Sequence, residues 1–129
     1  IGLFERVVGP RAGTDDDVFG TFGKVGPGQH DCIDESTNTT VYLSLLNQKG
    51  LIRFHSISAP DTRSPLFMRG RWPHRTAVVF ENGTGTAYAV DSWFHDNGFD
   101  AEVVPLQRWK EGWKPEKNLR KRRDFVANP

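Results

Sequence analysis

The chain of 129 residues contains a single cysteine, and its positive and negative charges nearly cancel. One cysteine excludes an internal disulfide framework, so cysteine usage leaves the compartment open between the cytoplasm and a periplasmic or secreted location. The formal net charge of +1 excludes a strong overall attraction to nucleic acid or to an anionic membrane. Every apolar run is shorter than the roughly 20 residues that cross a bilayer, so we expect no membrane span.

What the chain does contain is an ordinary globular balance of 36% hydrophobic and 26% charged residues. This length supports one hydrophobic core without disulfide or metal. From residue 114 onward the chain is basic, which is typical of a solvated tail. We therefore predict a single domain over residues 1–113 and a basic C-terminal tail over residues 114–129. No base-stacking motif accompanies the basic run, so no nucleic-acid partner is expected. The oligomeric state is not indicated.

Hydrophobic periodicity and turn residues predict an α+β fold. Small and apolar residues recur on one face between Ile33 and Lys49, which predicts a helix. Asn82-Gly83-Thr84-Gly85 separates two β-prone runs and predicts a β-hairpin. Pro105 can begin a short helix that runs to about Glu111. The predicted antiparallel sheet consists of Leu51–Ile57, Arg75–Glu81, Thr86–Ser92 and Ala101–Val104, and residues 58–73 are expected to form a long loop.

The only cysteine, Cys32, stands where a loop is expected to turn into the main helix. Unpaired N–H groups and the helix dipole favour a thiolate at such a position. A cysteine nucleophile also needs a base and a group that orients the base. His74 and Asp91 are near-opposite positions of the predicted hairpin, about 5 Å apart between backbones. This order predicts Cys32 as nucleophile, His74 as general base and acid, and Asp91 as the orienting carboxylate.

Two segments around these residues carry a family resemblance. Asp91-Ser92-Trp93 resembles the Asn-Ser-Trp segment of papain-like peptidases, and Asp31-Cys32-Ile33-Asp34 is similar to the Asp-Cys-Glu-Asp segment of bacterial transglutaminase-like cysteine proteinases. The resemblance spans roughly residues 29–93. It implies a papain-like or transglutaminase-like core, in which a helix bearing the cysteine packs on a small antiparallel sheet. It also implies a cysteine-dependent amide hydrolase, with a peptidase as the favoured activity and a protein or peptide as substrate.

The predicted chemistry also concerns the oxyanion donors, the acceptor of the acyl group and a cofactor. Gln29, three residues before Cys32, is predicted to donate its side-chain amide to the oxyanion, together with the Cys32 backbone N–H. Water as acceptor gives hydrolysis or deamidation, and an amine gives acyl transfer. In the bacterial group, acidic residues beside the cysteine help to bind calcium. Ile33 stands where that group has Glu, so no cofactor is expected and calcium is only what the resemblance implies.

Other interpretations of the same residues compete with this one. His30 and His55 are rival bases, and a zinc site from Cys32, His30 and His74 lacks the usual ligand spacing. Asp15-Asp16-Asp17 is expected to form a solvated turn or helix cap rather than a metal site.

A lone cysteine is often a core residue, so the alternative function is a catalytically inactive binding module of the same fold. A thiol packed among Leu43 and Leu46 would favour that alternative.

Overall fold

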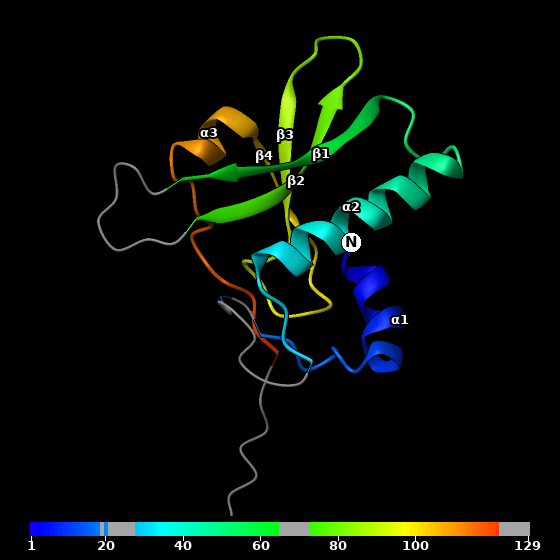
Figure 1. The fold of residues 1–129 in the computed structure, drawn as a ribbon, viewed down its shortest axis with the longest axis vertical. Coiled ribbons are helices and arrows are strands. Elements are labelled where there is room, and N and C mark those ends of the chain that lie inside the picture. Colours follow the sequence, from blue (N-terminus) through cyan, green and yellow to red (C-terminus); the bar gives the residue numbers. More distant parts are fainter. Residues whose placement is uncertain (19, 21–27, 65–72, 122–129) are drawn as a thin grey trace, which may run out of the picture.

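The computed structural model describes residues 1–18, 20, 28–64 and 73–121 (Figure 1). Within these residues, helices pack around a four-stranded antiparallel sheet whose strands lie in the order β1-β2-β3-β4. This confirms the predicted α+β class with a small antiparallel sheet. The elements are α1 (Gly2–Ala12), α2 (Cys32–Gln48), β1 (His55–Arg63), β2 (His74–Glu81), β3 (Ala87–Asp91), β4 (Glu102–Pro105) and α3 (Leu106–Lys110).

Helix α2 is the predicted cysteine-bearing helix, and it begins at Cys32 itself. Asp31 caps it, because one of its carboxylate oxygens accepts hydrogen bonds from the backbone N–H groups of Ile33 and Asp34. In return, the Asp34 carboxylate accepts a hydrogen bond from the Asp31 backbone N–H. This reciprocal capping box satisfies donors that the first helical turn leaves unpaired. The sequence thereby fixes the start of the helix, and with it the position of the sulfur.

The two faces of the sheet carry separate apolar clusters. On one face, Leu43 of α2 packs with Ala77, Val79 and Val90. The other cluster joins Ala89 and Val104 to Trp109 of α3, a side chain with no exposed surface. Alternate residues of a strand point to opposite faces, so the sheet lies between α2 and α3. Helix α1 packs beside α2, where the Phe4 and Tyr42 rings stack with centroids 4.7 Å apart (Figure 1).

The predicted first strand, Leu51–Ile57, was wrong in its bounds. Strand β1 starts at His55 and runs through Pro60 into the predicted loop, ending at Arg63. Pro60 is tolerated because β1 is an edge strand, and its pairing with β2 shifts register between Ser58 and Asp61. The rest of the predicted loop, residues 65–72, lies outside the described residues.

The predicted hairpin of β2 and β3 is confirmed, but its register differs from the predicted one. Ala77 pairs with Val90, so the same register places Thr76, rather than His74, opposite Asp91. His74 and Asp91 are therefore diagonal neighbours on one face, which still allows long side chains to meet.

Part of the predicted basic tail contacts the loop that follows β3. Asn118 donates to the Phe94 carbonyl at 2.7 Å, and the Lys121 N–H donates to the Asp96 carboxylate at 2.9 Å. Residues 118–121 are thus bound to this loop, whereas 122–129 lie outside the described residues. The domain boundary at residue 113 stays a prediction. Within the part of the chain that is described, no helix combines the length and hydrophobicity that crossing a membrane requires.

Candidate active site

The predicted base and its predicted orienting group are in direct contact. His74 Nε2 lies 2.7 Å from Asp91 Oδ2, and the two residues are 4% and 2% exposed. His74 is the first residue of β2 and Asp91 is the last residue of β3, so both lie at the same end of the hairpin. The contact assigns the Nε2 proton to the bond with the carboxylate and leaves Nδ1 as the basic nitrogen of the neutral ring.

Asp91 is itself held from two further sides. The Trp109 indole Nε1–H donates to Oδ2 at 2.7 Å, and the Trp93 backbone N–H donates to Oδ1 at 3.2 Å. A buried carboxylate needs such donors, because without them its desolvation would favour the protonated form. The three donors fix the carboxylate in one orientation, which in turn fixes the imidazole plane.

Aromatic rings enclose the His74 imidazole. The ring centroids of Trp93, Phe94 and Trp109 lie 4.5, 5.4 and 5.5 Å from that of His74. Burial lowers the pKa of His74, but hydrogen bonding to Asp91 and interaction with the Cys32 side chain outweigh it, so the pKa is raised above its usual value. The site therefore favours an imidazolium between the thiol and the carboxylate.

Cys32 supplies the third member of the group from the first turn of α2. Its sulfur lies 3.9 Å from the carbonyl oxygen of Pro73, the residue that precedes His74. The buried Nδ1 atom of His74 has no hydrogen bond within the described residues. Because Asp91 occupies Nε2, Nδ1 is the nitrogen left to act on the thiol. The fold thus brings together Cys32, His74 and Asp91, which are far apart in the sequence.

The side chain of Gln29 is hydrogen-bonded to the 16–18 segment instead of being free to donate to an oxyanion, as was predicted. Its side-chain amide donates to the Asp16 carbonyl at 3.0 Å, and its amide oxygen accepts the Val18 N–H at 3.2 Å. We therefore assign Gln29 to holding the 16–18 segment against the chain before α2. The Cys32 backbone N–H makes no hydrogen bond to the described residues, as expected for a first-turn donor, and it stays available to an oxyanion.

The rival bases occupy other surroundings. His55 starts β1 and its ring meets Tyr88 edge to face, with centroids 6.2 Å apart. Hydrogen bonding to Asp17 and Glu35 raises the pKa of His30 to about 10, so it is an imidazolium rather than a base at neutral pH. His30 contacts these carboxylates, so it does not form the zinc set considered with Cys32 and His74.

The acidic residues beside the cysteine do not form a cation site. The carboxylates of Asp31 and Asp34 form the hydrogen bonds of the capping box of α2. Among the described residues, only one group of His, Cys, Asp or Glu side chains is close enough together to hold a metal ion. It consists of Asp17, His30 and Glu35. The calcium implied by the resemblance therefore does not fit Asp31 and Asp34.

Sequence reasoning missed a polar connection between α2 and the residue after Asp91. The Ser92 hydroxyl donates to Glu35 Oε2 at 2.7 Å and lies 3.0 Å from the Thr39 hydroxyl. All three side chains are buried. The signal available in the sequence was the placement of Glu35 and Thr39 on the helix face that also carries Cys32.

No protein-family model matches the chain, and no curated protein or solved structure matches it either. The resemblance to papain-like and transglutaminase-like enzymes therefore stays a prediction.

Proposed function

We propose that this protein is a cysteine-dependent amide hydrolase of papain-like or transglutaminase-like arrangement, which acts on a protein or peptide. The observation that carries the proposal is the state of the His74 ring. Nε2 is bound to Asp91 at 2.7 Å, whereas Nδ1 is buried without a hydrogen bond in the described residues, and the Cys32 sulfur lies 3.9 Å from the carbonyl oxygen of the preceding Pro73. A structural histidine usually has both ring nitrogens hydrogen-bonded, because an unpaired buried nitrogen costs free energy.

In the proposed reaction, the thiol proton resides on His74 Nδ1 before substrate binds, and the Cys32 thiolate attacks the substrate carbonyl carbon. The resulting oxyanion accepts a hydrogen bond from the Cys32 backbone N–H. The C–N bond then breaks as the imidazolium gives its proton to the leaving amine, which leaves a thioester on the sulfur. Water attacks the thioester, His74 takes its proton, and the carboxylic acid leaves as the thiol is regenerated.

The same thioester supports two related outcomes. If the substrate amide is the side chain of glutamine or asparagine, ammonia leaves and the reaction is a deamidation. If an amine replaces water, the acyl group is transferred to it. Each outcome uses the same three side chains, so only substrate trials distinguish them.

One observation favours the alternative function, a catalytically inactive binding module. Cys32 is only 8% exposed. However, the buried apolar cluster of Leu43, Ala77, Val79 and Val90 does not include Cys32. The sulfur instead lies 3.9 Å from the Pro73 carbonyl oxygen, next to His74 in the chain, and the Cys32 side chain helps to raise the pKa of His74. These contacts support an activated thiol over a packed core residue.

Alkylation of the single thiol by iodoacetamide, followed over pH, tests the proposal. We expect the wild-type chain to react at pH 6 at least about tenfold faster than the His74→Ala variant, because the imidazolium stabilises the thiolate. Asp91→Asn should give an intermediate rate. His55→Ala is the matched control, since His55 lies away from the sulfur, and it should react like the wild type.

Equal alkylation profiles for the wild type and His74→Ala would contradict the proposal, as would a thiol that titrates near the unperturbed value of about 8.5 in both proteins. A thiol that reacts only when the protein is unfolded would support the inactive module instead. Circular dichroism of each variant separates these results from loss of fold.

A further inference from the structure

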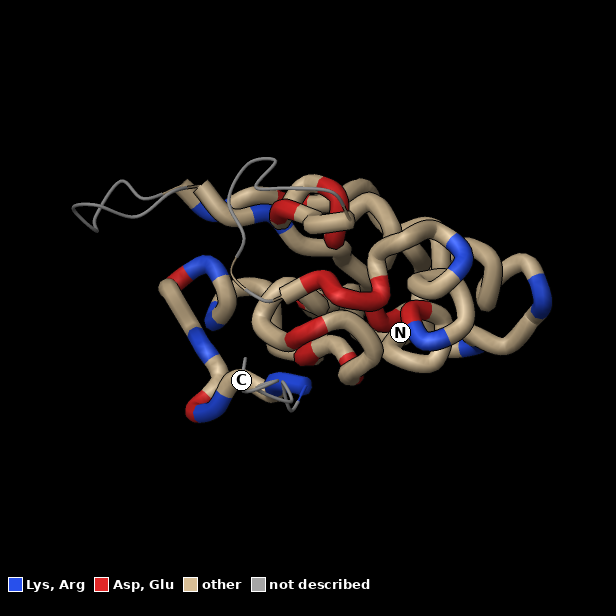
Figure 2. The backbone as a smooth tube through the Cα atoms, turned by 90° about the horizontal axis from the view of Figure 1, so that it is seen from below, with Lys and Arg blue, Asp and Glu red and all other residues tan. Residues whose placement is uncertain are grey.

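Acidic side chains from α1, from the segment that follows it and from the first turn of α2 lie close to one another. Figure 2 shows acidic stretches of chain close together near the N-terminus. Three acidic residues are buried in the fold, since Glu5, Asp17 and Glu35 are 6%, 4% and 8% exposed. The predicted solvated turn therefore holds for the exposed Asp15 and Asp16, whereas it is wrong for Asp17.

The two carboxylates nearest His30 each have one oxygen in use and one that faces the ring. Asp17 Oδ1 accepts the His30 backbone N–H at 2.9 Å, and Glu35 Oε2 accepts the Ser92 hydroxyl at 2.7 Å. The remaining oxygens, Asp17 Oδ2 and Glu35 Oε1, lie 3.4 and 3.6 Å from His30 Nδ1. The second bond of each carboxylate orients it, as the outer partners of metal ligands do.

The distances at His30 are longer than a charge-assisted hydrogen bond of about 2.7–2.9 Å. They match the separation of about 3.4 Å between two ligand atoms that bind one tetrahedral metal at about 2.1 Å. All three candidate ligand atoms lie within 4.8 Å of one another. The arrangement is therefore wide enough to admit an ion between the three side chains.

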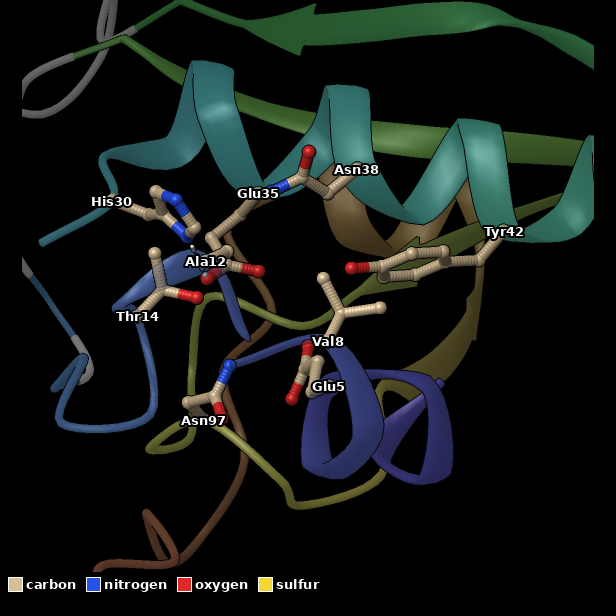
Figure 3. A pocket seen from close by; sticks show the side chains of 9 residues that line it. All are labelled: Glu5, Val8, Ala12, Thr14, His30, Glu35, Asn38, Tyr42 and Asn97. Carbon is tan, nitrogen blue, oxygen red and sulfur yellow. Dashed lines mark ion pairs between the residues drawn. The ribbon is translucent and has the colours of Figure 1, made fainter. Parts of the chain in front are cut away.

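A cavity of about 160 Å³ opens beside this group, between α1 and α2 (Figure 3). Thr14 and Asn97 line it and are 9% and 7% exposed. Neither side chain makes a hydrogen bond within the described residues, although buried polar groups usually have a partner. Figure 3 shows Thr14 beside His30, whereas Asn97 lies farther from His30, on the side of Glu5. The buried Thr14 side chain therefore offers a hydrogen-bond partner to a ligand shell beside His30, such as metal-bound water.

We propose that Asp17, His30 and Glu35 bind one divalent transition-metal ion, with zinc as the type case, and that water completes its coordination on the cavity side. An imidazole nitrogen with two carboxylates favours zinc or manganese over calcium and magnesium, which prefer oxygen ligands throughout. The ion replaces the His30 proton, which is released to solvent because only the neutral imidazole binds a metal, and it takes over the neutralisation of the carboxylates that the fold buries together. It ties the segment after α1 to the start of α2 and, through Ser92, to the end of β3.

Calorimetric titration with Zn²⁺ tests the site in EDTA-treated Cys32→Ser protein, because this background removes the thiol as a competing ligand. We expect one ion per chain, a dissociation constant in the micromolar range or below, and a rise of several degrees in Tm with saturating Zn²⁺. His30→Gln and Glu35→Gln should each weaken binding at least about thirtyfold. Gln at position 35 keeps an oxygen for Ser92, so it retains the structural bond.

His55→Gln and Asp16→Asn are the matched controls, since each makes the same chemical change at a residue outside the site, and they should leave Zn²⁺ affinity unchanged. Absence of saturable Zn²⁺ binding below about 1 mM would overturn the proposal, and so would equal weakening by the controls. Tighter binding of Ca²⁺ than of Zn²⁺ would also overturn it. The experiment measures metal binding in a protein without the thiol. A negative result would therefore overturn the metal site and would say nothing about the proposed hydrolase.

Discussion

Trp109 and Asp91 are joined by a hydrogen bond of 2.7 Å that connects the helix after the sheet to the predicted catalytic carboxylate. The indole has no exposed surface, and its N–H reaches the same Oδ2 atom that contacts His74. Trp109, a fully buried core residue, thus also orients the carboxylate. The stability of α3 and the geometry of the candidate site are therefore coupled.

Removal of the Asp91 carboxylate should lower stability. Asp91→Ala leaves the Trp109 and His74 donors buried without an acceptor, and we expect a loss of about 3–5 kcal/mol in the free energy of unfolding. Asp91→Asn keeps one acceptor oxygen and should lose less than half as much. Urea denaturation measures both values. A loss below about 1 kcal/mol for Asp91→Ala would show that these bonds contribute little.

His74 should make stability depend on pH. Since its pKa in the folded protein is raised, its contribution is fully present below the unfolded pKa of about 6.5 and is lost as pH rises through the folded value. His74→Gln keeps a donor for Asp91 but does not titrate. The wild type should therefore exceed His74→Gln in stability by more at pH 5.5 than at pH 9, as measured by Tm. A constant difference would contradict the raised pKa.

Glu5 should also make stability fall as pH rises, because its buried carboxyl group becomes charged. Burial is the main cause that raises its pKa to about 7, although the Gly98 N–H, which donates to it at 2.6 Å, opposes the shift. The folded state binds more protons than the unfolded state between pH 4.5 and 7, so stability falls as pH rises through this window.

Glu5→Gln removes the charge and keeps an acceptor for Gly98. We expect it to be close to the wild type at pH 4.5 and more stable by up to about 3 kcal/mol at pH 8.5, when both are unfolded by urea in the presence of EDTA. A variant that is less stable than the wild type at pH 8.5 would contradict this expectation. Glu116→Gln, at an exposed position, controls for the change of net charge.

Arg63 should stabilise the end of α3. Its guanidinium donates to the Trp109 and Trp113 carbonyls at 2.6 and 2.9 Å and lies 4.6 Å from the centre of the Trp109 ring. Arg63→Lys keeps the charge but cannot reproduce both bonds and the stacking, so we expect a loss of about 1–2 kcal/mol. Thermal unfolding measures it. An unchanged Tm would show that water replaces these contacts without cost.

Local patterns in the sequence predicted the hairpin and the cysteine-bearing helix, because turn residues and helix caps act over a few positions. Asn82 to Gly85 predicted the connection between β2 and β3. The capping box of Asp31 and Asp34 determines where α2 begins. The bounds of β1 could not be predicted, since a proline usually ends a strand. Only the edge position of β1 and its register shift make Pro60 acceptable.

The sequence by itself determined the order of Cys32, His74 and Asp91 and the helix start that carries the sulfur. Only the tertiary structure decided the diagonal register that joins His74 to Asp91, the Trp109 bond, and the convergence of Asp17 and Glu35 on His30. The physical reason is that caps and turns depend on neighbouring residues, whereas buried polar contacts depend on which distant groups share a water-free space. No local pattern specifies those partners.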